Sequence, residues 1–200
     1  MSKQLEFWFE FGSTYSYPTA ARIERLAHAC GITLIWRPFL LGPIFREQGW
    51  EDSPFNIYPA KGAYMWRDME RLCAALDLAF HRPSQFPRNG LLAARIACWF
   101  EVEAWLPDFV CSVYDANFVR DQDISNPRVV SSILEELQLP ASEIFDAAQR
   151  PESKAKLRAR TDQARSLGIF GAPSFLAAGE LFWGNDRLEA ALDWLQREVI

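Results

Sequence analysis

The sequence predicts an α/β fold in which a small core of strands and helices is interrupted by an all-helical insertion. Apolar runs with the period of β-strands occur only near the two ends of the chain. The long middle segment has helical patterns and one loop but no strand signal. The predicted domains are a core formed by 1–42 with 151–200, and an inserted helical domain, 43–150.

The first part of the core has the pattern of a β–α–β unit. In LEFWFEF (5–11) apolar side chains alternate along the chain, which is the period of a strand. A helical pattern follows over 14–30, and Gly31 supplies the left-handed residue that commonly ends a helix. ITLIWR (32–37) is a second apolar run. Because a helix separates the two strands, they should be parallel with a right-handed crossover.

The middle segment begins with an expected loop over 42–62, which contains three prolines and three glycines. Loops of this length in compact domains are usually functional or disordered, and the aromatic residues in this one favour a function. Helical patterns follow at about 62–77, 89–105, 107–119, 127–138 and 141–149.

The last part of the chain returns to the core. A helix is predicted from Pro151 to about Leu167, and the runs SFLAA and ELFW around Ala178-Gly179 predict an antiparallel hairpin. The final helix has one apolar face, formed by Leu188, Ala191, Leu192, Leu195 and Val199. The complete order, β–α–β, helical insertion, then α–β–β–α, predicts a thioredoxin-like core with an inserted helical domain.

Composition limits the function. The net charge of −5 over 200 residues argues against a nucleic-acid partner, and no apolar run has the length of a membrane span. The start of the chain does not resemble a signal peptide, so a cytoplasmic location is expected. The four cysteines are widely spaced and only two histidines are present. We therefore expect structural cysteines and no metal site.

The turn after the first strand is the candidate reactive site. In thioredoxin-like cores this turn carries the CxxC motif, because a helix N-terminus lowers the pKa of a thiol. Here Ser13 and Ser16 replace both cysteines, which excludes dithiol chemistry at this turn. The turn could instead stabilise the thiol of a ligand, for which glutathione is the candidate. Alternatively, Ser13 is only a helix N-cap.

Two later segments carry further candidate residues. In GIFGAPSF (168–175) we expect a cis peptide between Ala172 and Pro173, which would present the backbone of Ala172 to the reactive turn; an ordinary turn proline is the alternative.

In FWGNDRLE (182–189), Asn185 or Asp186 is expected to cap the last helix, with Asp186 and Glu189 as a capping box. Asp186 could also hold the ammonium group of the γ-glutamyl end of glutathione.

These motifs identify a family resemblance. The whole chain resembles the 2-hydroxychromene-2-carboxylate isomerase and kappa-class glutathione transferase group of the DsbA-like thioredoxin superfamily, through S-x-x-S-Y, P-A-K-G-x-Y-M (59–65), F-G-A-P and W-G-N-D-R. The resemblance implies glutathione as cofactor, with Ser13 activating its sulfur. Its expected contacts to the tripeptide are Lys61, Ala172, Pro173, Asn185 and Asp186.

The resemblance also implies a reaction. The thiolate of glutathione adds to a small aromatic carboxylate compound, a bond rotates in the adduct, and elimination returns the thiol. A place in aromatic compound catabolism and a homodimer are the corresponding expectations. The expected substrate pocket contains Trp50, Asn56, Tyr64 and His81, although the aromatic residues could equally be core and His81 a solvated loop residue. The alternatives are a kappa-like transferase that forms conjugates, or a binding protein without catalysis.

Overall fold

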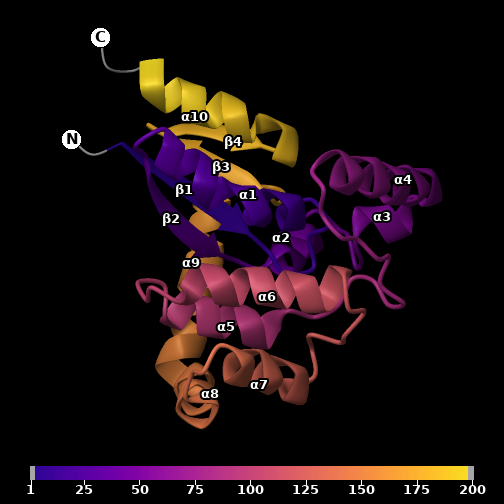
Figure 1. Cartoon of the computed structure of the whole chain (residues 1–200). Coiled ribbons are helices and arrows are strands. Elements are labelled where there is room, and N and C mark those ends of the chain that lie inside the picture. The colour runs from indigo at the N-terminus through magenta and orange to yellow at the C-terminus, as the bar shows by residue number, and fades with distance from the viewer. Residues whose placement is uncertain (1–2, 198–200) are drawn as a thin grey trace.

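The computed structural model describes residues 3–197 and contains one four-stranded mixed sheet of order β2-β1-β3-β4 (Figure 1). The strands are β1 (Gln4–Phe9), β2 (Thr33–Pro38), β3 (Ser174–Ala177) and β4 (Glu180–Trp183). β1 pairs with β2 in parallel, and with β3 in antiparallel orientation. β3 and β4 form the expected antiparallel hairpin. The two ends of the chain therefore meet in one sheet.

Helices cover both faces of this sheet and continue into the insertion. The helices at or near the sheet are α1 (Ser16–Ala29), α2 (Leu41–Glu47), α9 (Pro151–Ser166) and α10 (Leu188–Arg197). The other helices are α3 (Pro54–Ile57), α4 (Pro59–Ala75), α5 (Leu91–Trp99), α6 (Leu106–Phe118), α7 (Pro127–Glu136) and α8 (Ala141–Gln149). α5 to α8 gather on one side of the sheet, whereas α3 and α4 extend beside the end of α1 (Figure 1).

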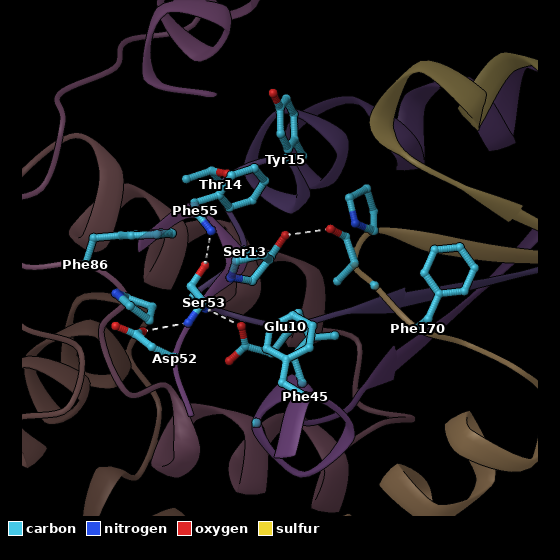
Figure 2. Close-up of a pocket in the computed structure, with 18 of the residues that line it drawn as sticks. Glu10, Ser13, Thr14, Tyr15, Phe45, Asp52, Ser53, Phe55, Phe86 and Phe170 are labelled. Atoms are coloured by element: carbon cyan, nitrogen blue, oxygen red, sulfur yellow. Dashed lines mark hydrogen bonds between the residues drawn. The ribbon is translucent and has the colours of Figure 1, made fainter. Parts of the chain in front are cut away.

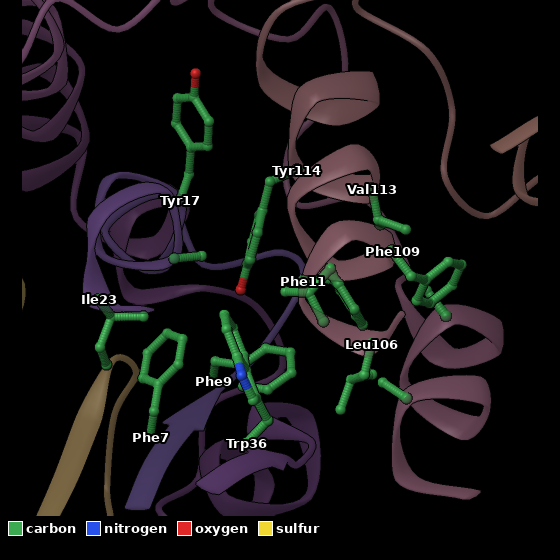
Figure 3. Close-up of a cluster of buried hydrophobic side chains, with 14 of the residues drawn as sticks. Phe7, Phe9, Phe11, Tyr17, Ile23, Trp36, Leu106, Phe109, Val113 and Tyr114 are labelled. Atoms are coloured by element: carbon green, nitrogen blue, oxygen red, sulfur yellow. The ribbon is translucent and has the colours of Figure 1, made fainter. Parts of the chain in front are cut away.

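The core explains the alternation in the first strand. Phe7 and Phe9 point into the main apolar cluster, where they meet Ile23 of α1 and Tyr114 of α6 (Figure 3). Trp8 points to the opposite face, into a smaller cluster formed with α2 and α9. β1 is therefore a central strand that is buried on both faces. The expected apolar face of α10 is buried at its first four positions, whereas Val199 lies outside the described residues.

The expected loop over 42–62 is largely helical, so this prediction was wrong. It contains most of α2, all of α3 and the start of α4, and residues 48–53 are its longest non-helical stretch. Pro54 and Pro59 are the first residues of α3 and α4, and Pro43 lies in the first turn of α2. In the first turn of a helix the missing N–H of proline removes no hydrogen bond, so these prolines begin helices instead of excluding them.

Two further properties concern the chain between residues 3 and 197. Within it, no helix is both long enough and apolar enough to cross a membrane. The same residues include no group of three or more histidine, cysteine or acidic side chains that could hold a metal ion.

Candidate active site

A cavity of about 1350 Å³ lies beside the reactive turn (Figure 2). Its walls come from segments that are distant in the sequence. These are the turn after β1, α2 with the following loop, α4, residues 86–91, the segment just before β3, and the end of β4 with the residues that follow it. Pockets for one small ligand commonly measure roughly 300–1,000 Å³. This cavity therefore has room for a ligand together with a second small molecule.

Ser13 lines this cavity, and its hydroxyl makes two hydrogen bonds. Its hydroxyl donates to the carbonyl oxygen of Ala172 at 2.8 Å, and it accepts from the backbone N–H of Ser16 at 3.3 Å. The second bond joins Ser13 to the first residue of α1, whose N-cap position is occupied by Tyr15 without a side-chain cap. Ser16, in contrast, is fully buried and does not line the cavity. Of the two serines, only Ser13 can therefore meet a ligand.

The segment before β3 has the predicted backbone. The peptide between Ala172 and Pro173 is cis, which confirms the expectation, and both residues line the cavity. The N–H of Gly184 donates to the carbonyl of Pro173 at 3.0 Å and joins this segment to the end of β4. The indole of Trp183 covers Gly171 so closely that a Cβ there would lie 2.4 Å from Nε1. A side chain at position 171 would displace this wall of the cavity.

Asn185 and Asp186 both line the cavity but differ in environment. Asn185 is buried, and its Oδ1 lies 3.0 Å from the Thr19 hydroxyl and accepts from the guanidinium of Arg22 at 3.1 Å. The side chain of Asp186 is 72% exposed and pairs with Arg187 at 3.0 Å.

The predicted capping box does not form. A short 3-10 turn, Asn185–Arg187, precedes α10 and has no side-chain cap, and Glu189 pairs with Arg22 instead of reaching back to Asp186. Because this extra turn separates Asp186 from the start of α10, its carboxylate faces the cavity and solvent.

The side of the cavity opposite the hairpin contains part of the predicted set. Lys61 lines the cavity, with its ammonium 4.8 Å from the ring of Tyr58. Trp50 also lines it and packs against Phe45, with ring centroids 5.5 Å apart. Phe55 completes this wall.

Three predicted pocket residues lie outside the lining, which corrects the sequence-based assignment. The Asn56 amide is held by the carboxylate of Asp52 and the carbonyl of Phe86. Tyr64 is 63% exposed on the outer side of α4. His81 lies in the exposed segment after α4, where its backbone N–H donates to Phe118.

The side chains of two other residues of this region are held in structural contacts. Arg88 is part of the cavity lining, but its side chain is buried and its guanidinium is bound to Asn117 and Asp121. Trp66 packs against Phe86, with ring centroids 4.9 Å apart, and does not line the cavity.

The sequence did not identify Glu10, one of the acidic residues of the site. Glu10 lines the cavity directly after β1, and its carboxylate accepts from the N–H of Gly12 at 2.9 Å. Burial raises the pKa of Glu10 to about 7, against the smaller lowering effect of the neighbouring backbone N–H groups. In the sequence, the position of Glu10 between Phe9 and Phe11 predicted an outward-facing residue of a strand. In the structure the strand ends at Phe9, before Glu10. Three aromatic rings of the lining, Phe45, Phe86 and Phe170, were also not identified.

Fold and site together define a class: a thioredoxin-fold protein that has a serine turn, a cis-proline and a large cavity in place of a dithiol. Residues 4–196 match the family of the DSBA-like thioredoxin domain, and the chain belongs to this family.

Named relatives refine this membership. The chain is 26% identical to 2-hydroxychromene-2-carboxylate isomerase of Sphingobium xenophagum, with 94% of this chain and 96% of the relative covered. It is 24% identical to human glutathione S-transferase kappa 1, with 94% and 89% covered. A solved structure of 2-hydroxychromene-2-carboxylate isomerase has a TM-score of 0.86 at 22% identity over 98% of this chain and 97% of that one. These findings confirm the predicted resemblance and the fold class.

Proposed function

We propose that this protein is a glutathione-dependent isomerase of small aromatic carboxylate compounds, located in the cytoplasm. The observation that carries the proposal is the pairing of Ser13 with the carbonyl of Ala172, beside a cis-proline and in the wall of the cavity. This pairing places a hydroxyl donor and an extended backbone edge together. A small peptide with a thiol needs both groups, the backbone edge to pair with its own backbone and the hydroxyl to donate to its sulfur.

Glutathione binding follows from these two groups. The backbone of its cysteinyl residue pairs with the backbone of Ala172, whose carbonyl is bound by Ser13 in the absence of ligand. The ligand N–H replaces Ser13 at that carbonyl, and the freed Ser13 hydroxyl donates to the sulfur. Asp186 and Asn185 lie where they can bind the charged γ-glutamyl end, and Lys61 supplies a cation for a carboxylate of the tripeptide.

The remaining cavity accommodates the substrate. Phe45, Trp50 and Phe55 form an apolar wall suited to a flat ring system. The thiolate adds to a conjugated carbon and converts a double bond to a single bond. Rotation about this bond and elimination of the thiolate then give the isomer. Glutathione is recovered unchanged, so it acts as a cofactor.

Product analysis tests the proposal. The purified protein is incubated with 2-hydroxychromene-2-carboxylate, the substrate in the names of two relatives, and with or without glutathione. We expect isomerisation that requires catalytic amounts of glutathione and is strongly reduced in Ser13→Ala. Consumption of one glutathione per substrate would indicate a kappa-like transferase. Binding of glutathione without turnover of this or other conjugated aromatic carboxylates would indicate a binding protein without catalysis.

A homodimer is also part of the proposal. Support comes from exposed aromatic side chains near the β4 edge of the sheet, where Trp183 is 54% and Trp194 is 39% exposed. Light scattering coupled to size-exclusion chromatography should give about twice the monomer mass of 22.9 kDa.

A further inference from the structure

The carboxyl group of Glu10 is an ionisable group of the site that the mechanism above leaves unused. A hydrogen bond of 3.0 Å from the N–H of Ser13 to the carbonyl of Glu10 closes a tight turn, which brings the two residues to the same end of β1. The Glu10 side chain folds back onto the N–H of Gly12, and a Cβ on Gly12 would lie 3.0 Å from its Oε2. The carboxylate is therefore packed against the reactive turn and faces the cavity that contains Ser13 (Figure 2).

We propose that Glu10 is the general base that takes the proton from the sulfhydryl of bound glutathione and returns it when the thiol leaves. In this step the S–H bond breaks, an O–H bond forms on the carboxylate, and the negative charge moves from oxygen to sulfur. Ser13 then stabilises the thiolate by its hydrogen bond. The inference rests on the proposed function, because it assigns the proton acceptor at the same site.

The surroundings of Glu10 favour this transfer. Within residues 3–197 no cation forms an ion pair with its carboxylate, and the hydrogen-bond donors beside it are the backbone N–H groups of Gly12 and Ser13. Of the titratable groups around it, Tyr114 donates its hydroxyl to the backbone carbonyl of Glu10, and Arg88 is bound to Asp121. The other charged residues that line the cavity are Arg46, Glu51, Asp52, Lys61, Asp68, Arg71 and Asp186.

Electrostatic repulsion favours transfer of the thiol proton to Glu10 over its loss to solvent. If glutathione lost its proton to solvent, the cavity would hold a thiolate beside a poorly compensated carboxylate, and like charges in a partly buried site disfavour each other. Transfer to Glu10 leaves the net charge of the cavity unchanged, because the carboxylate becomes neutral as the thiolate forms. Burial raises the pKa of Glu10 to about 7, closer to that of a thiol at about 8.5, so the proton can move in both directions.

The test counts protons. Glutathione is titrated into wild-type protein and Glu10→Gln by calorimetry at about pH 7.5 in buffers of different ionisation enthalpy, and thiolate is measured by ultraviolet absorbance of the same complexes. Glutamine retains the acceptor for the N–H of Gly12, so the turn should be preserved. S-Methylglutathione, which has no thiol proton, is the control ligand. It should give the same proton count in both proteins once the protons that Glu10 itself takes up or releases on binding are subtracted.

We expect the wild type to form thiolate while releasing less than about half a proton per thiolate, and Glu10→Gln to release about one. Equal release per thiolate in both proteins would overturn the role of Glu10 and leave the proposed function intact. Absence of binding by both tripeptides would overturn the proposed function, and the inference with it.

Discussion

Ser13 and Ala172 are separated by 159 positions in the sequence and joined by a hydrogen bond of 2.8 Å from the Ser13 hydroxyl to the Ala172 carbonyl. The bond connects the turn after β1 with the cis-proline segment before β3. It also means that the hydroxyl proposed to activate a thiolate already has an acceptor in the free protein. A ligand that pairs with Ala172 therefore controls whether Ser13 is available.

The first prediction concerns the two serines. Ser13→Ala should raise the pKa of the bound glutathione thiol by about one to two units, because a hydrogen bond to a charged group contributes about 1.5–3 kcal/mol and one pKa unit corresponds to about 1.36 kcal/mol. Affinity should change little. Thiolate absorbance of the binary complex against pH measures this value. Ser16→Ala is the matched control, since Ser16 is buried away from the cavity, and a shift with Ser16→Ala alone would reverse the two roles.

Asp186→Ala should weaken glutathione binding by roughly tenfold to a hundredfold, the loss expected for one charge-assisted hydrogen bond. Its melting temperature should stay close to that of the wild type, because Asp186 is exposed and caps no helix. Asp193→Ala on α10 removes an equivalent exposed charge away from the cavity and serves as the control. Equal affinities of both variants, measured by calorimetry, would contradict the role of Asp186.

Asn185→Ala should lower the stability of the fold, unlike Asp186→Ala. Asn185 is buried and accepts a hydrogen bond from Arg22 and one from Thr19, and both are lost in the variant. Thr19 and Arg22 keep backbone carbonyl partners, so we expect the cost of ordinary hydrogen bonds, about 0.5–1.5 kcal/mol each, as a decrease in the free energy of unfolding in addition to weaker binding. Urea denaturation measures it. Unchanged stability would show that this network does not hold the residue in place.

Glu10 should make stability depend on pH without any ligand. Its pKa is raised from 4.5 to about 7, so between these values the folded state keeps a proton that the unfolded chain has released. The free energy of unfolding should therefore fall as the pH rises through this window, by at most about 3 kcal/mol. Glu10→Gln does not titrate and should lack this part of the fall. Urea denaturation of both proteins at about pH 5 and pH 8 gives the comparison, and parallel curves would contradict the shift.

The cysteines should give no disulfide reductase activity. All four are free, and burial raises the pKa of Cys73 to about 11 and that of Cys111 to about 12. At neutral pH these thiols are protonated and therefore poor nucleophiles. We expect no reduction of insulin disulfides and slow alkylation of Cys73 and Cys111. Reductase activity that disappears on substitution of one cysteine would place the reactive site elsewhere.

The sequence determined the order of the strands and of the helices outside residues 42–62, the parallel β1–β2 pair, the β3–β4 hairpin and the cis peptide before Pro173. These follow from signals carried by neighbouring residues: the period of apolar side chains, glycines that end helices, and a proline placed before a strand. The same kind of signal identified Ser13 as the distinctive residue of the reactive turn. Local chain physics suffices for such features.

Only the tertiary structure decided which side chains face the cavity. Asn56, Tyr64 and His81 had suitable chemistry, but the orientation of α4 and of the loops beside it directs them elsewhere. Glu10 had no distinctive signal, because the end of β1 at Phe9 and the fold of the following turn place its carboxylate inside. The tertiary structure also distinguishes the two serines of the turn, because Ser13 faces Ala172 whereas Ser16 faces the core. A side chain's environment is set by segments far away in the sequence, and its own neighbours along the chain carry no record of them.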